Sequence, residues 1–264
     1  MALLKVLLLL GLGVSVNSAV SLQKRIIGGE NCKDSERLYH VRLESSNATD
    51  MIRCGGSLIH PRWILTAAHC LKSGPGWTHV AILKVHPRTA GQQRQLVKQY
   101  PFIFKYDGKK HNIMLLKLQT PVTGVPLAQL TDCRHRLKVG DVVQLAGEGP
   151  TSLDTNNQQS INAAVPAHLQ CVDINVYSLP AFMPFYGNVF SAGAANKYIC
   201  YGDDGGAALH NGMIHGVISH GGRFVFSNHV LHLGTSIWSR LIEIRFIMNV
   251  CKYKRWIKKR TGLK

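Results

Sequence analysis

The stretch Cys200-Tyr201-Gly202-Asp203-Asp204-Gly205-Gly206-Ala207 contains three glycines and two adjacent carboxylates within eight residues. Glycine adopts backbone angles that are strained for other residues, so this composition predicts a tight loop with an exposed backbone. A carboxylate buried in such a loop needs a partner of opposite charge. The function of the whole chain depends largely on the roles of these two carboxylates, Asp203 and Asp204.

A second stretch is the most specific in the sequence, and it reads Cys54-Gly55-Gly56-Ser57-Leu58-Ile59-His60-Pro61-Arg62-Trp63-Ile64-Leu65-Thr66-Ala67-Ala68-His69-Cys70. It resembles the catalytic-histidine segment of chymotrypsin-like (trypsin-like, kallikrein-like) serine proteases, and agreement over the whole stretch opposes a merely structural role for His69. The loop at 202–207 resembles the same family's nucleophile loop, Gly-Asp-Ser-Gly-Gly-Pro. Asp204 stands where the family keeps its serine, and Ala207 where it keeps its proline.

The resemblance covers roughly residues 26–260 and implies an all-β fold, a double six-stranded antiparallel β-barrel of trypsin-like type with a C-terminal helix. The residue pattern agrees, because short apolar stretches bounded by glycine and proline recur at strand length and spacing. They are Val80–Val85, Ile113–Leu118 and Val142–Ala146.

The segment 249–260 resembles the family's closing helix. Val250, Tyr253 and Ile257 fall on one face of that helix at spacings of three and four residues. No internal repeat or linker sets a further domain apart, and 264 residues are ordinary for a single all-β unit.

The first residues predict secretion. Lys5 precedes an apolar run at 7–12 that is too short to span a bilayer, and small residues follow it. We expect a signal peptide at 1–18, a short propeptide at 19–25 and a trypsin-like domain at 26–264. The location would be extracellular, where cysteines pair.

The pair Lys24-Arg25 before Ile26 indicates a processing site. The alternative is a chance dibasic pair in a loop. In the family, cleavage there frees an isoleucine amine that pairs with the aspartate preceding the serine. The resemblance therefore implies an ion pair between Ile26 and Asp203.

Seven cysteines cannot all pair within one chain. The resemblance implies three bridges, Cys54–Cys70, Cys32–Cys171 and Cys133–Cys251. Cys200 is then left over, because the usual position of its partner in the family holds no cysteine here. It is either a buried thiol or the site of a disulfide to another chain.

Serine-protease chemistry needs a nucleophile, a base and a carboxylate that orients the base. His69 is the base, but Asn112 stands at the position of the carboxylate and Asp204 at that of the nucleophile. An amide favours the wrong imidazole tautomer, and in trypsin this change lowers turnover about 10⁴-fold. An aspartate beside the oxyanion-hole amides of Gly202 and Asp204 would occupy the hole or pair with protonated His69, so we expect no proteolysis.

The substrate cleft also departs from the family pattern. Tyr198 stands at the base of the primary specificity pocket, which a tyrosine would fill. The family's Ser-Trp-Gly wall reads Ser219-His220-Gly221, and its Gly-Trp-Gly reads Gly147-Glu148-Gly149.

The formal charge is +17, and the first 25 residues contribute three cations and no acid, so the mature protein is basic. Such a charge favours anionic partners but no specific nucleic acid. We expect heparin-like polyanions or anionic membrane surfaces to bind the last helix. The alternative is that its basic side chains form a solvated face that binds no partner. The predicted patch is Lys252, Lys254, Arg255, Lys258, Lys259 and Arg260. Asn47 begins a glycosylation sequon, Asn-Ala-Thr.

The function expected from these features is that of a secreted, inactive protease homologue acting as a binding or effector protein. The alternatives are a residual hydrolase with a non-serine mechanism and a partner or decoy subunit linked through Cys200. No cofactor is expected. Thirteen histidines prompt a metal site, but their spacing matches no ligand pattern, so none is predicted.

Overall fold

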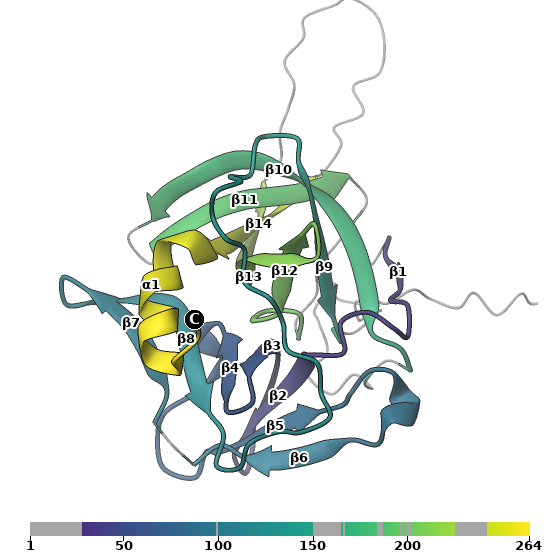
Figure 1. Ribbon diagram of the computed structural model, residues 1–264, viewed down its shortest axis with the longest axis vertical. Helices are drawn as coiled ribbons and strands as arrows, with labels where there is room; N and C mark the ends of the chain where they lie inside the picture. The colour runs from purple at the N-terminus through teal and green to yellow at the C-terminus, as the bar shows by residue number, and fades with distance from the viewer. Residues whose placement is uncertain are drawn as a thin grey trace, which may run out of the picture.

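The computed structural model describes residues 28–98, 100–149, 165, 167–183, 187–195, 197, 199, 202–224 and 242–264 (Figure 1). The predicted signal peptide and propeptide lie outside these residues, as do Ile26, Tyr198 and Cys200.

Two antiparallel sheets make up the described part of the chain, and the C-terminal sheet closes on itself. Its ring closes because β9 pairs with both β10 and β12, and the short β1 pairs with β10 outside the ring. The strands in ring order are β9 (Val142–Gly147), β10 (Gln170–Met183), β11 (Gly187–Ala195), β14 (Ile242–Asn249), β13 (Met213–Phe224) and β12 (Ala207–His210), with β1 at Glu30–Asn31.

The N-terminal sheet has seven strands, and β6 and β7 lie at its two ends. Three-residue 3₁₀ helices, η1 (Ala68–Cys70) and η2 (Arg88–Ala90), interrupt the chain between strands. In sheet order the strands are β6 (Gln93–Leu96), β5 (Thr78–Leu83), β2 (His40–Ser46), β3 (Met51–His60), β4 (Trp63–Thr66), β8 (Lys109–Lys117) and β7 (Phe102–Tyr106). The mostly-β fold predicted from the sequence is confirmed.

The apolar stretches predicted as strands lie in β5, β8 and β9, with boundaries shifted by a few residues. The core is built from side chains of these strands, and Ile82, Ile113 and Leu145 are fully buried. The structure joins Cys32 to Cys171, Cys54 to Cys70 and Cys133 to Cys251 by disulfides. No helix in the described part of the chain has the length and apolarity that a membrane crossing requires.

Helix α1 (Val250–Thr261) is defined at both ends by local signals. The Asn249 side chain accepts a backbone N–H of the first turn, and Gly262 ends the helix in the left-handed conformation at φ 78°. Val250, Tyr253 and Ile257 are all buried, as the spacing of the apolar residues predicted.

This helix follows the last strand of the C-terminal sheet but packs against the N-terminal one, beside β7 and β8 (Figure 1). The Phe104 ring of β7 lies 4.9 Å from the Tyr253 ring and 5.5 Å from that of Trp256, both edge-on. Edge-to-face contacts of this kind stabilise aromatic clusters beyond the apolar area they bury. The helix therefore connects the two halves of the molecule.

A buried ion-pair cluster makes a second connection between the halves. Glu148 follows β9 in the C-terminal half, and its carboxylate pairs with Arg42 of β2 at 3.3 Å and with Arg88 of η2. Arg42 also pairs with Glu44 at 3.1 Å. The Glu148 side chain is 4% exposed and that of Arg42 is 7% exposed, so each charge depends on the others for compensation.

We expect Glu148→Gln to lower the free energy of unfolding by about 3 kcal/mol, because it removes the central charge of a buried cluster. The matched control is Arg94→Gln, since Arg94 pairs with Glu44 but its side chain is 58% exposed. That change should cost less than about 1 kcal/mol. Urea denaturation with intact disulfides measures both, and an equal loss in the two variants would contradict the role given to the cluster.

Candidate functional site

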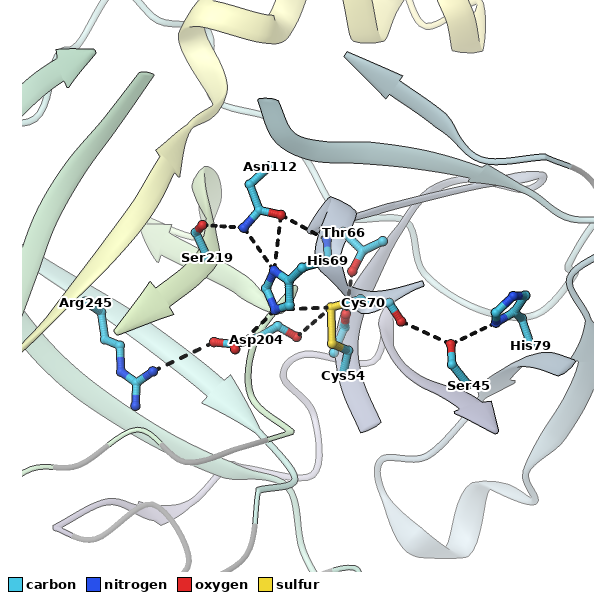
Figure 2. The surroundings of a disulfide bond; sticks show 11 residues. Ser45, Cys54, Thr66, His69, Cys70, His79, Asn112, Asp204, Ser219 and Arg245 are labelled. Atoms are coloured by element: carbon cyan, nitrogen blue, oxygen red, sulfur yellow. Dashed lines mark hydrogen bonds and ion pairs between the residues drawn. A yellow bond between two sulfur atoms is a disulfide. The ribbon is translucent and has the colours of Figure 1, made fainter. Parts of the chain in front are cut away.

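The predicted site histidine lies where the two sheets meet. His69 is the middle residue of η1, the short turn that follows β4. The disulfide between Cys54 of β3 and Cys70 fixes this turn to the neighbouring strand, beside the imidazole (Figure 2). The His69 side chain is 36% exposed, so one edge of the ring is accessible from solvent.

Asn112, on β8, holds the inner edge of the imidazole. Its Oδ1 accepts the backbone N–H of His69 at 3.0 Å, and the same oxygen lies 3.1 Å from Nδ1 of the ring. The Asn112 Nδ2 donates to the Oγ of Ser219 on β13 at 2.6 Å. The same Nδ2 lies 2.9 Å from His69 Nδ1, so both the oxygen and the nitrogen of the amide face this ring atom.

Asp204 lies on the outer side of the same ring. Its Oδ2 is 3.2 Å from His69 Nε2, and its Oδ1 is 3.9 Å from Nη1 of Arg245, on β14 (Figure 2). The Arg245 Nη2 also donates to the carbonyl of Ile199. With side chains of Asp204 and Arg245 only 14% and 10% exposed, the carboxylate lies between two basic groups in a poorly hydrated position.

The loop that presents Asp204 is fixed by the residue before it. Asp203 is fully buried, and its Oδ1 accepts the backbone N–H of Gly149 at 2.8 Å. Gly205, at φ 83°, has no room for a side chain, because a Cβ there would lie 2.3 Å from the Thr66 Oγ1. Since Ile26 lies outside the described residues, its ion pair with Asp203 stays a prediction.

The charge state of His69 follows from these contacts. Burial lowers the pKa of the imidazole, but the hydrogen bond and charge of Asp204, aided by the bond to Asn112, outweigh it and raise the pKa above 6.5. The imidazolium donates from both nitrogens, and the two acceptors beside it are Asn112 Oδ1 and Asp204 Oδ2. These two acceptors favour the charged ring, and the charge of Lys72 opposes it.

The structure also places the other predicted residues that lie in the described part of the chain. Gly202 has φ 102° and its backbone packs beside Gly149. Asn47 forms the turn between β2 and β3, where its Oδ1 accepts the N–H of Asp50 at 2.6 Å, and its glycosylation stays a prediction. On α1, Lys252, Arg255, Lys259 and Arg260 are exposed, whereas Lys254 donates to the Thr131 carbonyl at 2.6 Å.

Two groups of side chains in the described residues have spacing compatible with a metal ion, Cys54 with His69 and Cys70, and Cys32 with Glu36 and Cys171. All four cysteines are in disulfides and provide no thiolate. Neither group fits a metal site, because thiolate is the sulfur ligand that metals bind.

Arg245 and the Glu148 cluster were not predicted from the sequence. The only local signal for Arg245 is a cation inside the apolar strand β14, and its partner Asp204 is 41 residues away in the chain. Such a cation in a buried strand requires a counter-charge, which is the pattern that could have drawn attention to it.

The chain matches the sequence model of the family described as Trypsin over residues 26–230. It is 30% identical over 209 residues to the beta-fibrinogenase brevinase of Gloydius blomhoffii, and this alignment covers 75% of this chain and 84% of that protein. It is 28% identical over 240 residues to kallikrein 1-related peptidase b27 of Mus musculus, covering 84% and 88%. Neuropsin, a serine protease expressed in the limbic system of mouse brain, superposes with a TM-score of 0.62 at 25% identity over 88% of this chain and 97% of its own. This chain belongs to the trypsin family.

Proposed function

We propose that this chain is a secreted, catalytically inactive trypsin-family protein that acts by binding polyanions. The observation that carries the inactivity is the 3.2 Å contact between the Asp204 carboxylate and His69 Nε2. A serine protease needs a hydroxyl at this nitrogen, so that the neutral imidazole can accept its proton.

Three features of the site oppose catalysis together. Asp204 provides no hydroxyl proton, and its charge favours the imidazolium, which cannot serve as a base. Asn112 presents an uncharged amide to Nδ1, and an amide does not stabilise an imidazolium formed during turnover as a carboxylate does.

The residual-hydrolase alternative requires the Asp204 carboxylate to attack a carbonyl as a nucleophile. Both of its oxygens lie beside basic groups, Oδ2 at His69 and Oδ1 at Arg245. Electron density held in ion pairs is less available for attack, so the geometry favours a structural carboxylate over a nucleophilic one.

Secretion is supported by the predicted signal peptide and by the three disulfides, which form in oxidising compartments. Several relatives in the comparison are snake venom serine proteases, for example that of Crotalus adamanteus, 30% identical over 208 residues. The alternative role as a partner or decoy subunit depends on Cys200, which lies outside the described residues.

Polyanion binding is supported by the net charge of +17 and by the exposed basic face of α1. Lys252, Arg255 and Lys259 are exposed at spacings of three and four residues, so they share a face of the helix. Exposed cations aligned in this way attract anionic chains and release the counterions condensed on them.

The chain processed after Arg25 should cleave no member of a mixed peptide library, with turnover at least about 10⁴-fold below that of an active trypsin-family protease. Asp204→Asn should behave identically in the same assay. Measurable turnover by the natural chain that disappears in Asp204→Asn would establish the carboxylate as a nucleophile and refute the proposal.

On a heparin column the processed chain should elute well above physiological ionic strength, about 0.15 M. Its affinity should fall steeply with salt, because each neutralised anionic group releases a counterion. Elution near physiological salt would sink the polyanion role while leaving the inactivity untouched.

Asp204→Asn should lower the pKa of His69, because the burial that opposes ionisation would no longer be outweighed by the carboxylate. NMR titration of the imidazole measures the change. Since the folded-state pKa is raised, the His69–Asp204 pair stabilises the fold fully below pH 6.5, and this contribution is lost as the pH rises through the raised value. Asp204→Asn should therefore destabilise the chain more at pH 5.5 than at pH 9, and an equal loss at both would contradict the assignment.

A further inference from the structure

A large groove opens beside His69 and Asn112 on the N-terminal half of the molecule. Its volume is about 1580 Å³, and side chains from η1, β7, β8 and α1 line it together with the segments around β5 and β6. It lies between the two end strands of the N-terminal sheet, β6 and β7. The predicted patch on α1 meets this groove at Arg260.

The charge of this groove is of one sign. Its described lining contains no carboxylate, and besides His69 it contains five exposed cations, Lys72, Lys98, Lys105, Lys110 and Arg260. A hollow lined by one sign of charge focuses its field on the space within it. The groove is therefore complementary to an anionic ligand.

Two of these positive charges lower the stability of the fold. Lys105 of β7 and Lys110 of β8 are direct partners across the hairpin, and like charges in that position are destabilising. Both lysines are exposed. An anion between them would relieve the repulsion.

Aromatic rings lie among the cations. The Arg260 guanidinium lies 5.6 Å from the centre of the Phe102 ring, which orders both side chains at the mouth of the groove. The Tyr100 ring is 93% exposed, and Trp77 and Trp256 also line the groove. Flat apolar faces beside cations suit a ligand that carries apolar ring faces and anionic groups in alternation.

We propose that this groove binds a linear sulfated oligosaccharide, with sugar rings against the aromatic faces and sulfate groups at the lysines. The proposal rests on the polyanion-binding function above, and it places the main binding site in the groove and not on the outer face of α1. Its inner end lies at His69, beside Lys72.

An acidic peptide is the other anionic chain that could fill a groove between two end strands, by adding a strand to one of them. Pro101, immediately before β7, has no N–H to donate, and the exposed Lys105 lies in the strand itself. Proline and lysine are the residues that discourage strand addition at sheet edges. Recognition by side chains, as in sulfate binding, fits this edge better than backbone pairing.

The test measures binding of a heparin hexasaccharide to the processed chain and to two variants of equal charge. Lys105→Gln/Lys110→Gln should weaken binding about tenfold and reduce the salt slope by about two. The same variant should unfold at no lower urea concentration than the natural chain, because it removes a like-charge pair. Lys252→Gln/Lys259→Gln, on the outer face of α1, should weaken binding less than threefold.

Two further readouts locate the ligand. Tyr100→Ala should weaken binding several-fold without changing the salt slope, because it removes a ring and no charge. Saturation with hexasaccharide should raise the pKa of His69, because the charge of Lys72, which lowers that pKa, is then neutralised.

The outcomes separate this inference from the proposed function. No binding of the natural chain at low salt would refute both. If the α1 variant loses as much affinity as the groove variant, or more, the polyanion function stands and the groove is not the binding site. A glutamate-rich peptide that displaces the hexasaccharide and binds more tightly would overturn the assignment of the ligand class.

Discussion

The buried carboxylate of Asp203 is the constraint on which the site depends. It has no access to solvent, and its bond to the Gly149 N–H lies in the segment that continues β9. Gly147 is equally constrained, because a Cβ there would lie 1.8 Å from the Asp203 Oδ1. A single side chain thus fixes both the loop at 202–206 and the end of β9, and with them the direction of Asp204.

Because Asp203 holds this loop in place, the residue at position 204 determines the electrostatics of the site. A serine at that position would be neutral, whereas Asp204 places a charge between His69 and Arg245. Asp204 and Asn112 stabilise the positive charge on the His69 imidazole. The loop therefore positions an ion pair beside the imidazole, and this pair is a stabilising element.

The sequence predicted the site well where the family pattern is local and poorly where partners are distant. His69, Asn112 and Asp204 could be identified because each lies in a recognisable segment, and the structure brings them together. The buried face of α1 followed from spacing alone. The Arg42–Glu148 pair spans 106 residues, and no pattern in a single sequence indicates which buried charges meet. The groove likewise depends on side chains from six separate segments, which only the folded chain assembles.

The return of α1 to the N-terminal sheet bears on how the chain matures during synthesis. Phe104 emerges from the ribosome about 150 residues before Tyr253 and Trp256, the rings that pack on it. Until the helix arrives, the first half of the chain exposes an aromatic surface, and exposed apolar surface promotes aggregation of intermediates. Oxidation of Cys133 with Cys251 joins a linker between the halves to the helix that covers that surface. We therefore expect dependence on chaperones to end when the last, twelve-residue helix docks, and a nascent chain stalled before it to remain chaperone-bound.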